Sequence, residues 1–154
     1  MKKIIFAFTV LSLSLSGTSC LKDECHGKTI QSESGAITGY AAANSINGTT
    51  HSSGLYYEMT LAGTGVTPDL NSVCKVRYTG KLLDGTVFDS QQGTPVTIAV
   101  NGTIPGWQIA LQLMKEGGKI KIIVPSALAY GCQGNGSIPG NAILYFEIEL
   151  VDVL

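Results

Sequence analysis

The stretch CKVRYTGKLLDGTVFDS, residues 74–90, decides the fold class of this chain. In its first half, Cys74, Val76 and Tyr78 alternate with charged or polar residues, and this period of two predicts a half-buried β-strand. Asp84-Gly85 then separates this run from a second strand-like run, Thr-Val-Phe. Because Asp-Gly between two such runs is a strong hairpin signal, the stretch predicts an antiparallel β-hairpin.

Runs with the same period of two lie on both sides of the hairpin. Each run is bounded by Gly or Pro residues, which interrupt strands. These runs predict strands at residues 55–61, 96–100, 120–124 and 144–150. Glycine is frequent, with 19 in 154 residues, and this frequency indicates the many turns of a sheet-rich fold.

One amphipathic helix is predicted between these strands. Pro105 suits a first helical turn, because its missing N–H would have no partner there. An apolar stripe runs from Trp107 to Met114, Lys115 lies near the end, and Gly117 stops the helix. The fold class is therefore α+β, with five or six antiparallel strands and one helix laid across the sheet. Such a helix leaves a cleft beside the sheet, a natural place for a small apolar site.

Residues 1–19 have the pattern of a secretory signal peptide. Lys2 and Lys3 precede an apolar run over residues 4–15, and small residues follow up to Cys20. Small residues leading into a cysteine resemble a bacterial lipoprotein signal, in which Cys20 becomes the first mature residue and carries the lipid. An ordinary signal that leaves Cys20 as a free thiol is the alternative. The chain is thus expected to be exported and anchored in the cell envelope, either in the periplasm or at the outer membrane.

Residues 20–51 are rich in Ser, Thr, Asn and Gly and are interpreted as a linker. Within them, Ile37, Tyr40 and Ala41 recur at helical spacing and predict a short helix. A helix of this length is too short to be stable alone, so it must pack on the main domain. The main domain is expected to span residues 52–154.

The cysteines allow at most one disulfide within the exported chain. If Cys20 carries a lipid, three cysteines remain. Cys74 lies in a predicted strand and is expected to be a small buried apolar residue. The sequence leaves open whether Cys25 and Cys132 pair or stay as free thiols.

The composition and motifs exclude several function classes. Lys and Arg total 10 and Asp and Glu total 11, so the net charge of −1 does not fit a nucleic-acid binder. No Ser, His and Asp set has a recognisable context, and of the two histidines one lies in the tail and the other at the edge of the domain, which argues against catalysis by a histidine base. The sequence has no P-loop, no GxGxxG after a strand and no metal-ligand spacing, so no cofactor and no metal are expected.

Aromatic residues are the distinctive feature of the domain. Each one alone is most simply a core residue. Several of them, however, lie where predicted elements end, and a pocket mouth forms at such places. The set comprises Tyr78, Phe88, Trp107, Tyr130 and Phe146.

Five motifs occur in the order and spacing of the FKBP-type peptidyl-prolyl cis-trans isomerases, which the chain resembles from about Ser52 to Leu154. They are VRYTG (76–80), DGTVFDS (84–90), IPGW (104–107), LAYG (128–131) and IP (138–139). The resemblance implies a half-barrel of five or six antiparallel strands wrapped around one helix. It also implies cis-trans isomerisation of X–Pro bonds in exported proteins. Proline-containing polypeptides are then the substrates, macrolides are further ligands, and no cofactor is needed.

The resemblance also implies which residues form the site. They are Tyr78, Phe88, Asp89, Ile104, Trp107, Tyr130 and Phe146, with Val96, Thr103 and Ile138 at the rim. Trp107 would be the floor of the pocket, and the Ile104 amide and the Tyr130 hydroxyl would donate to substrate carbonyls. Val96 and Thr103 depart from the aromatic residue and the valine that are common in the family. Additional glycines in the loop 131–140 are expected to loosen it.

Two other functions fit the same pattern. The domain is either a module that binds proline-containing segments with weak or no turnover, or a surface protein whose site has decayed. Retention of the pocket residues argues against the second of these. The predicted linker helix is too short to be one of the long dimerising helices of some family members, so a monomer is expected.

Overall fold

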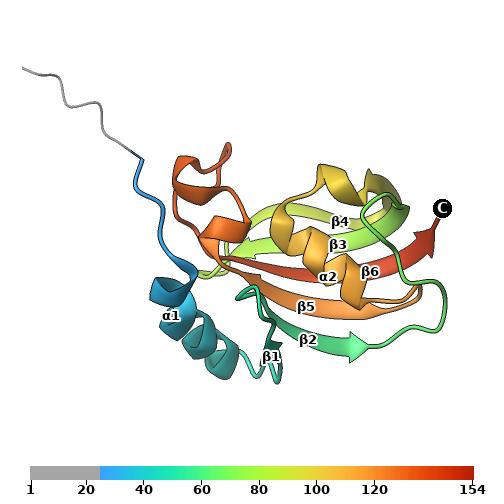
Figure 1. Cartoon of the computed structure of the whole chain (residues 1–154), viewed down its shortest axis with the longest axis horizontal. Coiled ribbons are helices and arrows are strands. Elements are labelled where there is room, and N and C mark those ends of the chain that lie inside the picture. The colour runs from blue at the N-terminus through green and yellow to red at the C-terminus, as the bar shows by residue number, and fades with distance from the viewer. Residues whose placement is uncertain (1–24) are drawn as a thin grey trace, which may run out of the picture.

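Six antiparallel strands form a single sheet in the computed structural model, which describes residues 25–154 (Figure 1). The order across the sheet is β1-β2-β5-β6-β3-β4. The strands are β1 (Thr49–Thr50), β2 (Tyr56–Leu61), β3 (Val73–Leu82), β4 (Val87–Ala99), β5 (Lys119–Val124) and β6 (Leu144–Val153). This arrangement confirms the predicted α+β class. The predicted signal peptide 1–19 and Cys20 lie outside the described residues.

The hairpin between β3 and β4 forms as predicted. Asp84 Oδ1 accepts a hydrogen bond of 2.8 Å from the Thr86 amide, and Gly85 takes a φ of 91°, which a glycine adopts without strain. Beyond the turn, β4 continues as one strand to Ala99, whereas the sequence predicted two separate runs. Val100 lies in a short 3₁₀ turn (Val100–Gly102) rather than in the strand.

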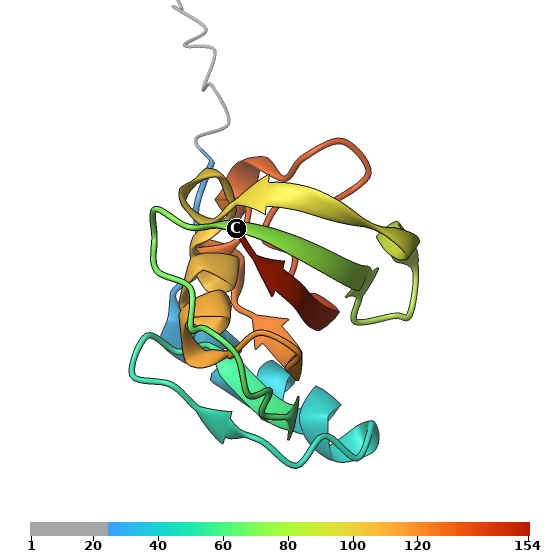
Figure 2. The ribbon, with the colours of Figure 1, turned by 90° about the vertical axis from the view of Figure 1, so that its right-hand side faces the viewer.

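Helix α2 (Pro105–Leu113) lies across the inner face of the sheet, and Figure 2 shows the strands curving around it. Trp107 and Leu111 are buried against the core. The helix ends at Leu113, slightly earlier than predicted, although Met114 remains fully buried. Gly106 allows close packing on β5, because a Cβ there would come within 2.5 Å of Val124 Cγ1.

Helix α1 (Ile30–Ala43) occupies the segment that was interpreted as a linker. Ile37 and Ala41 on this helix pack against Ile123 of β5 and Tyr145 of β6. Because side chains alternate along a strand, Ile123 and Tyr145 point away from α2 and onto the outer face of the sheet. The prediction that a short helix packs on the domain is confirmed. The sheet itself begins with β1, just before the predicted domain start at residue 52.

Candidate active site

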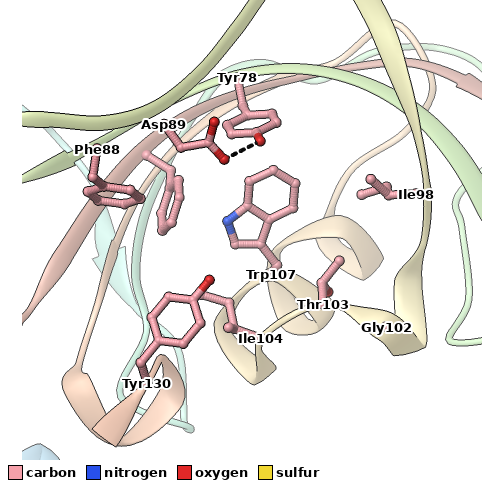
Figure 3. A pocket seen from close by; sticks show the side chains of 10 residues that line it. Tyr78, Phe88, Asp89, Ile98, Gly102, Thr103, Ile104, Trp107 and Tyr130 are labelled. Carbon is pink, nitrogen blue, oxygen red and sulfur yellow. Dashed lines mark hydrogen bonds between the residues drawn. The ribbon is translucent and has the colours of Figure 1, made fainter. Parts of the chain in front are cut away.

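A cavity of about 340 Å³ lies between α2 and the inner face of the sheet (Figure 3). Its volume is within the usual range of small-ligand sites. The structure brings all seven predicted site residues together there, with Thr103 from the predicted rim. The lining consists of Tyr78, Phe88, Asp89, Ile98, Gly102, Thr103, Ile104, Trp107, Tyr130 and Phe146.

Trp107 forms the floor of the cavity and is the centre of an aromatic cluster. Its ring meets Tyr78 at 5.0 Å and Phe146 at 5.4 Å between centroids, both edge to face. Phe88 meets Phe146 at 5.5 Å in the same geometry. Edge-to-face contacts place the positive edge of one ring against the negative face of the next, which stabilises the set. The apolar walls are therefore mutually supported and held in place.

Gly80 makes the contact between the two phenylalanines possible. A Cβ at this position would lie 2.7 Å from the Phe88 ring and 2.8 Å from the Phe146 ring. The sequence pattern predicts no separate role for this glycine. A glycine inside a strand, where close approach by another group is a common reason for it, is the signal that points to this role.

Tyr78 and Asp89 form the polar edge of the cavity. The Tyr78 hydroxyl donates a hydrogen bond of 2.5 Å to Asp89 Oδ2. Burial raises the pKa of Tyr78 well above its ordinary value, and the hydrogen bond to the Asp89 carboxylate raises it further. The phenol is therefore a firmly protonated donor, and its bond orients the exposed carboxylate at the rim.

Ile104 and Tyr130 line the cavity, and each carries a donor without a partner in the described chain. Within residues 25–154, neither the Ile104 amide nor the Tyr130 hydroxyl has a hydrogen-bond partner. In Figure 3 the Tyr130 hydroxyl points toward Trp107. The backbone beside Ile104 is fixed, because Gln108 Nε2 donates to the Thr103 carbonyl at 2.8 Å and Thr103 Oγ1 donates to the Val100 carbonyl at 2.8 Å. The site thus presents two positioned donors above an apolar floor.

Two residues predicted at the rim, Val96 and Ile138, do not line the cavity. Val96 pairs with Val76 on β3 and packs on the core, while Ile98, two residues further along the same face, lines the cavity. Ile138 is turned into the core by its backbone pairing with Asn135 and is 7% exposed. Alternation gives the face of a strand but does not say which residue on that face reaches the cavity.

The loop that follows Tyr130 is held by a disulfide and by close backbone packing. Cys132 forms a disulfide with Cys25, which answers the pairing that the sequence left open, and Cys74 is buried and free as predicted. The glycine-rich character of this loop serves packing: a Cβ at Gly140 would collide with the Cys132 carbonyl. The expected loosening of this loop by extra glycine is therefore opposed by a covalent link.

A cluster that could bind a metal ion and a helix that could span a membrane are both absent from the described part of the chain. Within residues 25–154, no group of three or more His, Cys, Asp or Glu side chains is placed to hold a metal ion. No helix in this range is long and apolar enough to cross a membrane. The cavity holds an apolar floor, aromatic walls and hydrogen-bond donors, an arrangement suited to an apolar group that has hydrogen-bond acceptors beside it.

Comparisons with known proteins agree with this class of site. A family profile of the FKBP-type peptidyl-prolyl cis-trans isomerases matches residues 65–151. The FKBP-type isomerase FkpA of Aeromonas hydrophila is 50% identical over 103 residues, which is 66% of this chain and 38% of that protein. The outer membrane protein MIP of Legionella longbeachae is 47% identical over 104 residues, covering 66% of this chain and 45% of that protein.

A solved structure shows the same fold. The crystal structure of a peptidyl-prolyl cis-trans isomerase from Pseudomonas syringae pv. tomato superposes with a TM-score of 0.69 at 33% identity, covering 83% of this chain and 98% of that one. The chain belongs to the FKBP-type peptidyl-prolyl cis-trans isomerase family. It spans less than half the length of the Aeromonas and Legionella relatives, at 38% and 45% of those proteins.

Proposed function

We propose that this protein catalyses cis-trans isomerisation of X–Pro bonds in exported polypeptides. The observation that carries the proposal is the cavity itself: an indole floor and aromatic walls in a volume of about 340 Å³, lined by Ile104 and Tyr130, whose amide and hydroxyl donors have no partner within the described residues. A proline ring is apolar and compact, and the carbonyl groups beside it need donors. The family membership supports the same activity.

The chemistry needs no nucleophile. The barrier to rotation about an X–Pro bond, about 18–20 kcal/mol, comes from resonance that gives the C–N bond partial double-bond character. Twisting the bond removes this resonance and makes the amide less polar. An apolar cavity solvates the polar planar amide less well than water does, so it favours the twisted form relative to the planar form. Catalysis is then tighter binding of the twisted amide than of the ground state.

The named residues divide this work between them. Trp107 and the rings around it hold the proline ring, while the Ile104 amide and the Tyr130 hydroxyl donate to the carbonyl groups on either side. Asp89 lines the cavity and is oriented by Tyr78, and we assign it to the carbonyl of the residue that precedes the proline. The ring is thus fixed while the other side of the bond turns.

The test is prolyl isomerisation by the chain from residue 21 onward, followed on a short X–Pro peptide after a solvent jump. The double variant Tyr130→Phe, Asp89→Ala removes one donor and the rim carboxylate. We expect its kcat/KM to fall about tenfold or more, because a lost hydrogen bond in a partly dry site costs about 1–3 kcal/mol. The matched control, Tyr40→Phe, Asp152→Ala, removes the same groups outside the cavity and should retain wild-type activity.

The alternative is a module that binds proline-containing segments without turnover. The same cavity serves both functions, so only a rate measurement separates them. If the folded wild-type chain does not accelerate isomerisation above background but still captures a proline peptide, the binding module replaces the enzyme.

We further propose a place in the cell envelope, through a lipid on Cys20. The sequence pattern of residues 1–20 supports this, as does the Cys25–Cys132 disulfide, since disulfides persist in oxidising compartments. A relative 47% identical over its match is named an outer membrane protein.

Labelling with a radioactive fatty acid tests the anchor, and label that persists in Cys20→Ser would exclude it. We also propose that the protein is a monomer, which light scattering tests. Macrolide binding in the cavity, which we propose as well, is tested by competition between a macrolide and a proline peptide.

A further inference from the structure

A carboxylate is buried where α1 meets the segment that leads to Tyr130. Glu33 of α1 is 2% exposed, and its Oε2 accepts a hydrogen bond of 2.8 Å from the backbone amide of Ser126, which is fully buried. Within the described residues, Glu33 Oε1 and Ser126 Oγ have no partner. Glu33 lies outside the residues 65–151 that match the family profile.

The buried side chain of Glu33 is unusual for its surroundings. The rest of the interface between α1 and the sheet is apolar, with Ile37, Ala41, Ile123 and Tyr145 at its centre. An apolar side chain would be buried there at lower cost than an acid, so Glu33 does not serve the packing of α1. Its only hydrogen bond in the described chain is the one that it accepts from the Ser126 amide, so holding this amide is the role that its contacts support.

The amide that Glu33 holds belongs to Ser126, the first residue of a short turn that precedes Tyr130. The 3₁₀ turn Ser126–Leu128 is closed by bonds from Leu128 N to the Pro125 carbonyl at 2.9 Å and from Ala129 N to the Ser126 carbonyl at 3.0 Å. Tyr130 follows directly, with its hydroxyl in the cavity. A displacement of Ser126 is therefore passed to Tyr130 through a short hydrogen-bonded segment.

The chain beyond Tyr130 is attached to the same N-terminal segment. Cys132 is linked to Cys25 by the disulfide. Asn141 donates to the His26 carbonyl at 3.0 Å and accepts from the Lys28 amide at 3.1 Å. In Figure 1 the segment that leads into α1 runs beside this loop. Tyr130 therefore lies between two attachments, and Glu33 supplies the one on its N-terminal side.

We propose that Glu33 is a positioning residue for Tyr130, acting through the Ser126 amide, and that it fixes the donor in the cavity from outside the matched domain. This inference rests on the proposed isomerase function for its effect on rate. The attachment itself has a readout that does not depend on turnover.

The experiment compares Glu33→Leu and Glu33→Gln with the wild-type chain. Leucine fills the apolar interface but cannot accept the bond, whereas glutamine keeps an acceptor oxygen. The matched control is Glu58→Leu, which removes a mostly buried carboxylate that faces Lys121 on the sheet. Glu33→Ala is the second variant, in case leucine prevents folding.

Amide hydrogen exchange is the first readout. We expect Glu33→Leu to speed exchange in residues 126–131 about tenfold or more, because a local opening replaces a fixed turn. Glu33→Gln should stay within about twofold of wild type, and Glu58→Leu should leave this segment unchanged. Unchanged exchange in folded Glu33→Leu and Glu33→Ala would overturn the proposal.

Turnover is the second readout. Glu33→Leu should lower kcat about threefold to tenfold with a smaller change in KM, and Glu33→Gln should restore it. In a Tyr130→Phe background, Glu33→Leu should cost less than about twofold, since residues that act through one another are not additive. An equal loss in both backgrounds would contradict an action through Tyr130. An inactive wild-type chain would refute the proposed function alone, and the exchange result would still decide the attachment.

Discussion

At the scale of single residues, Tyr78 contacts both the apolar floor and the polar rim of the cavity. Its ring lies edge to face with Trp107 at 5.0 Å, and its hydroxyl donates to Asp89 at 2.5 Å. One side chain therefore both supports the floor and orients the rim carboxylate. A phenol can do this only while it is protonated, and its burial beside a carboxylate keeps it so.

The raised pKa of Tyr78 predicts a loss of stability at alkaline pH. In the unfolded chain the phenol ionises near pH 10, whereas burial and Asp89 keep it protonated in the folded protein. Above about pH 10 the unfolded chain therefore binds fewer protons than the folded protein, and the free energy of unfolding decreases as pH rises. Below about pH 10 both states are protonated and the contribution is fully present.

The measurement is the urea midpoint of wild type and of Tyr78→Phe between about pH 8 and pH 11. We expect the wild-type midpoint to fall more steeply than that of the variant. Burial also raises the pKa values of Tyr40 and Tyr145, and both residues contribute equally in the two proteins. Parallel curves would show that Tyr78 titrates in the folded protein as it does in the unfolded chain.

The residues of the site could be named from the sequence only because their motifs resemble a known family. Physical patterns alone gave aromatic residues near element ends and could not separate a wall from the core. Ile98 and Gly102 were missed, since neither belongs to a quoted motif and alternation places Val96 and Ile98 on one face. Glu33 was missed because burial of an acid in a polar-looking linker leaves no signal in the sequence.

At the scale of elements, β4 shows where the pattern of a strand is insufficient. Gly93 and Pro95 lie within it, and both residues usually argue against a continuous strand. The strand nevertheless spans Val87–Ala99, but its pairing with β3 shifts register between Gln91 and Val96, so Gly93 and Pro95 lie in a bulge of this edge strand. An edge strand pairs on one side only, so it tolerates a residue without an N–H.

The N-terminal segment is the second element whose role the sequence concealed. The predicted short helix is present. Its apolar and polar residues are not clearly separated onto two faces, so the sequence did not show which surface it packs against. Its partners, Ile123 and Tyr145, lie on the outer face of the sheet, and the disulfide joins its leading residues to a loop 107 positions away. Such pairings depend on topology, which local patterns do not contain.

The disulfide should be a large contributor to stability. A link that closes a loop of this length restricts the unfolded chain, and loss of such a link typically costs about 2–5 kcal/mol. We expect Cys25→Ser, Cys132→Ser to lower the free energy of unfolding by that amount. The measurement is urea unfolding with and without a reductant.

The double variant also controls for other effects of the reductant. It has no disulfide to reduce, so its urea midpoint should not change when reductant is added. The wild-type midpoint should move toward that of the variant when the reductant is added. A wild-type midpoint that ignores a reductant known to have reduced the bond would contradict the stabilising role.

At the scale of the whole molecule, the sheet is covered on both faces but unequally. The inner face packs against α2, and the hydrophobic cluster between them is larger than the cluster beneath α1. The outer face is covered by α1 only at one end, over β5 and β6, and elsewhere carries surface ion pairs such as Lys75–Asp152 at 2.7 Å. Exposed ion pairs of this kind contribute little, so the free energy of the outer face comes mainly from α1.

A chain that begins at residue 52 should therefore fold less stably than one that begins at residue 25. Removing α1 exposes Ile123 and Tyr145, which are fully buried and 5% exposed in the whole protein. Exposure of two large apolar side chains costs about 3–6 kcal/mol. The truncation also removes β1 from the edge of β2.

Urea unfolding of the two chains, both carrying Cys132→Ser, separates the packing of α1 from the disulfide. Ile37→Ala in the longer chain is the intermediate case and should cost about 2–4 kcal/mol, because it empties the centre of the α1 interface without exposing all of it. The order of stability should be the long chain, then Ile37→Ala, then the chain from residue 52. If the short chain equals the long one, α1 contributes no net packing energy. Its place on the sheet would then depend on the Cys25–Cys132 disulfide, which both of these chains lack.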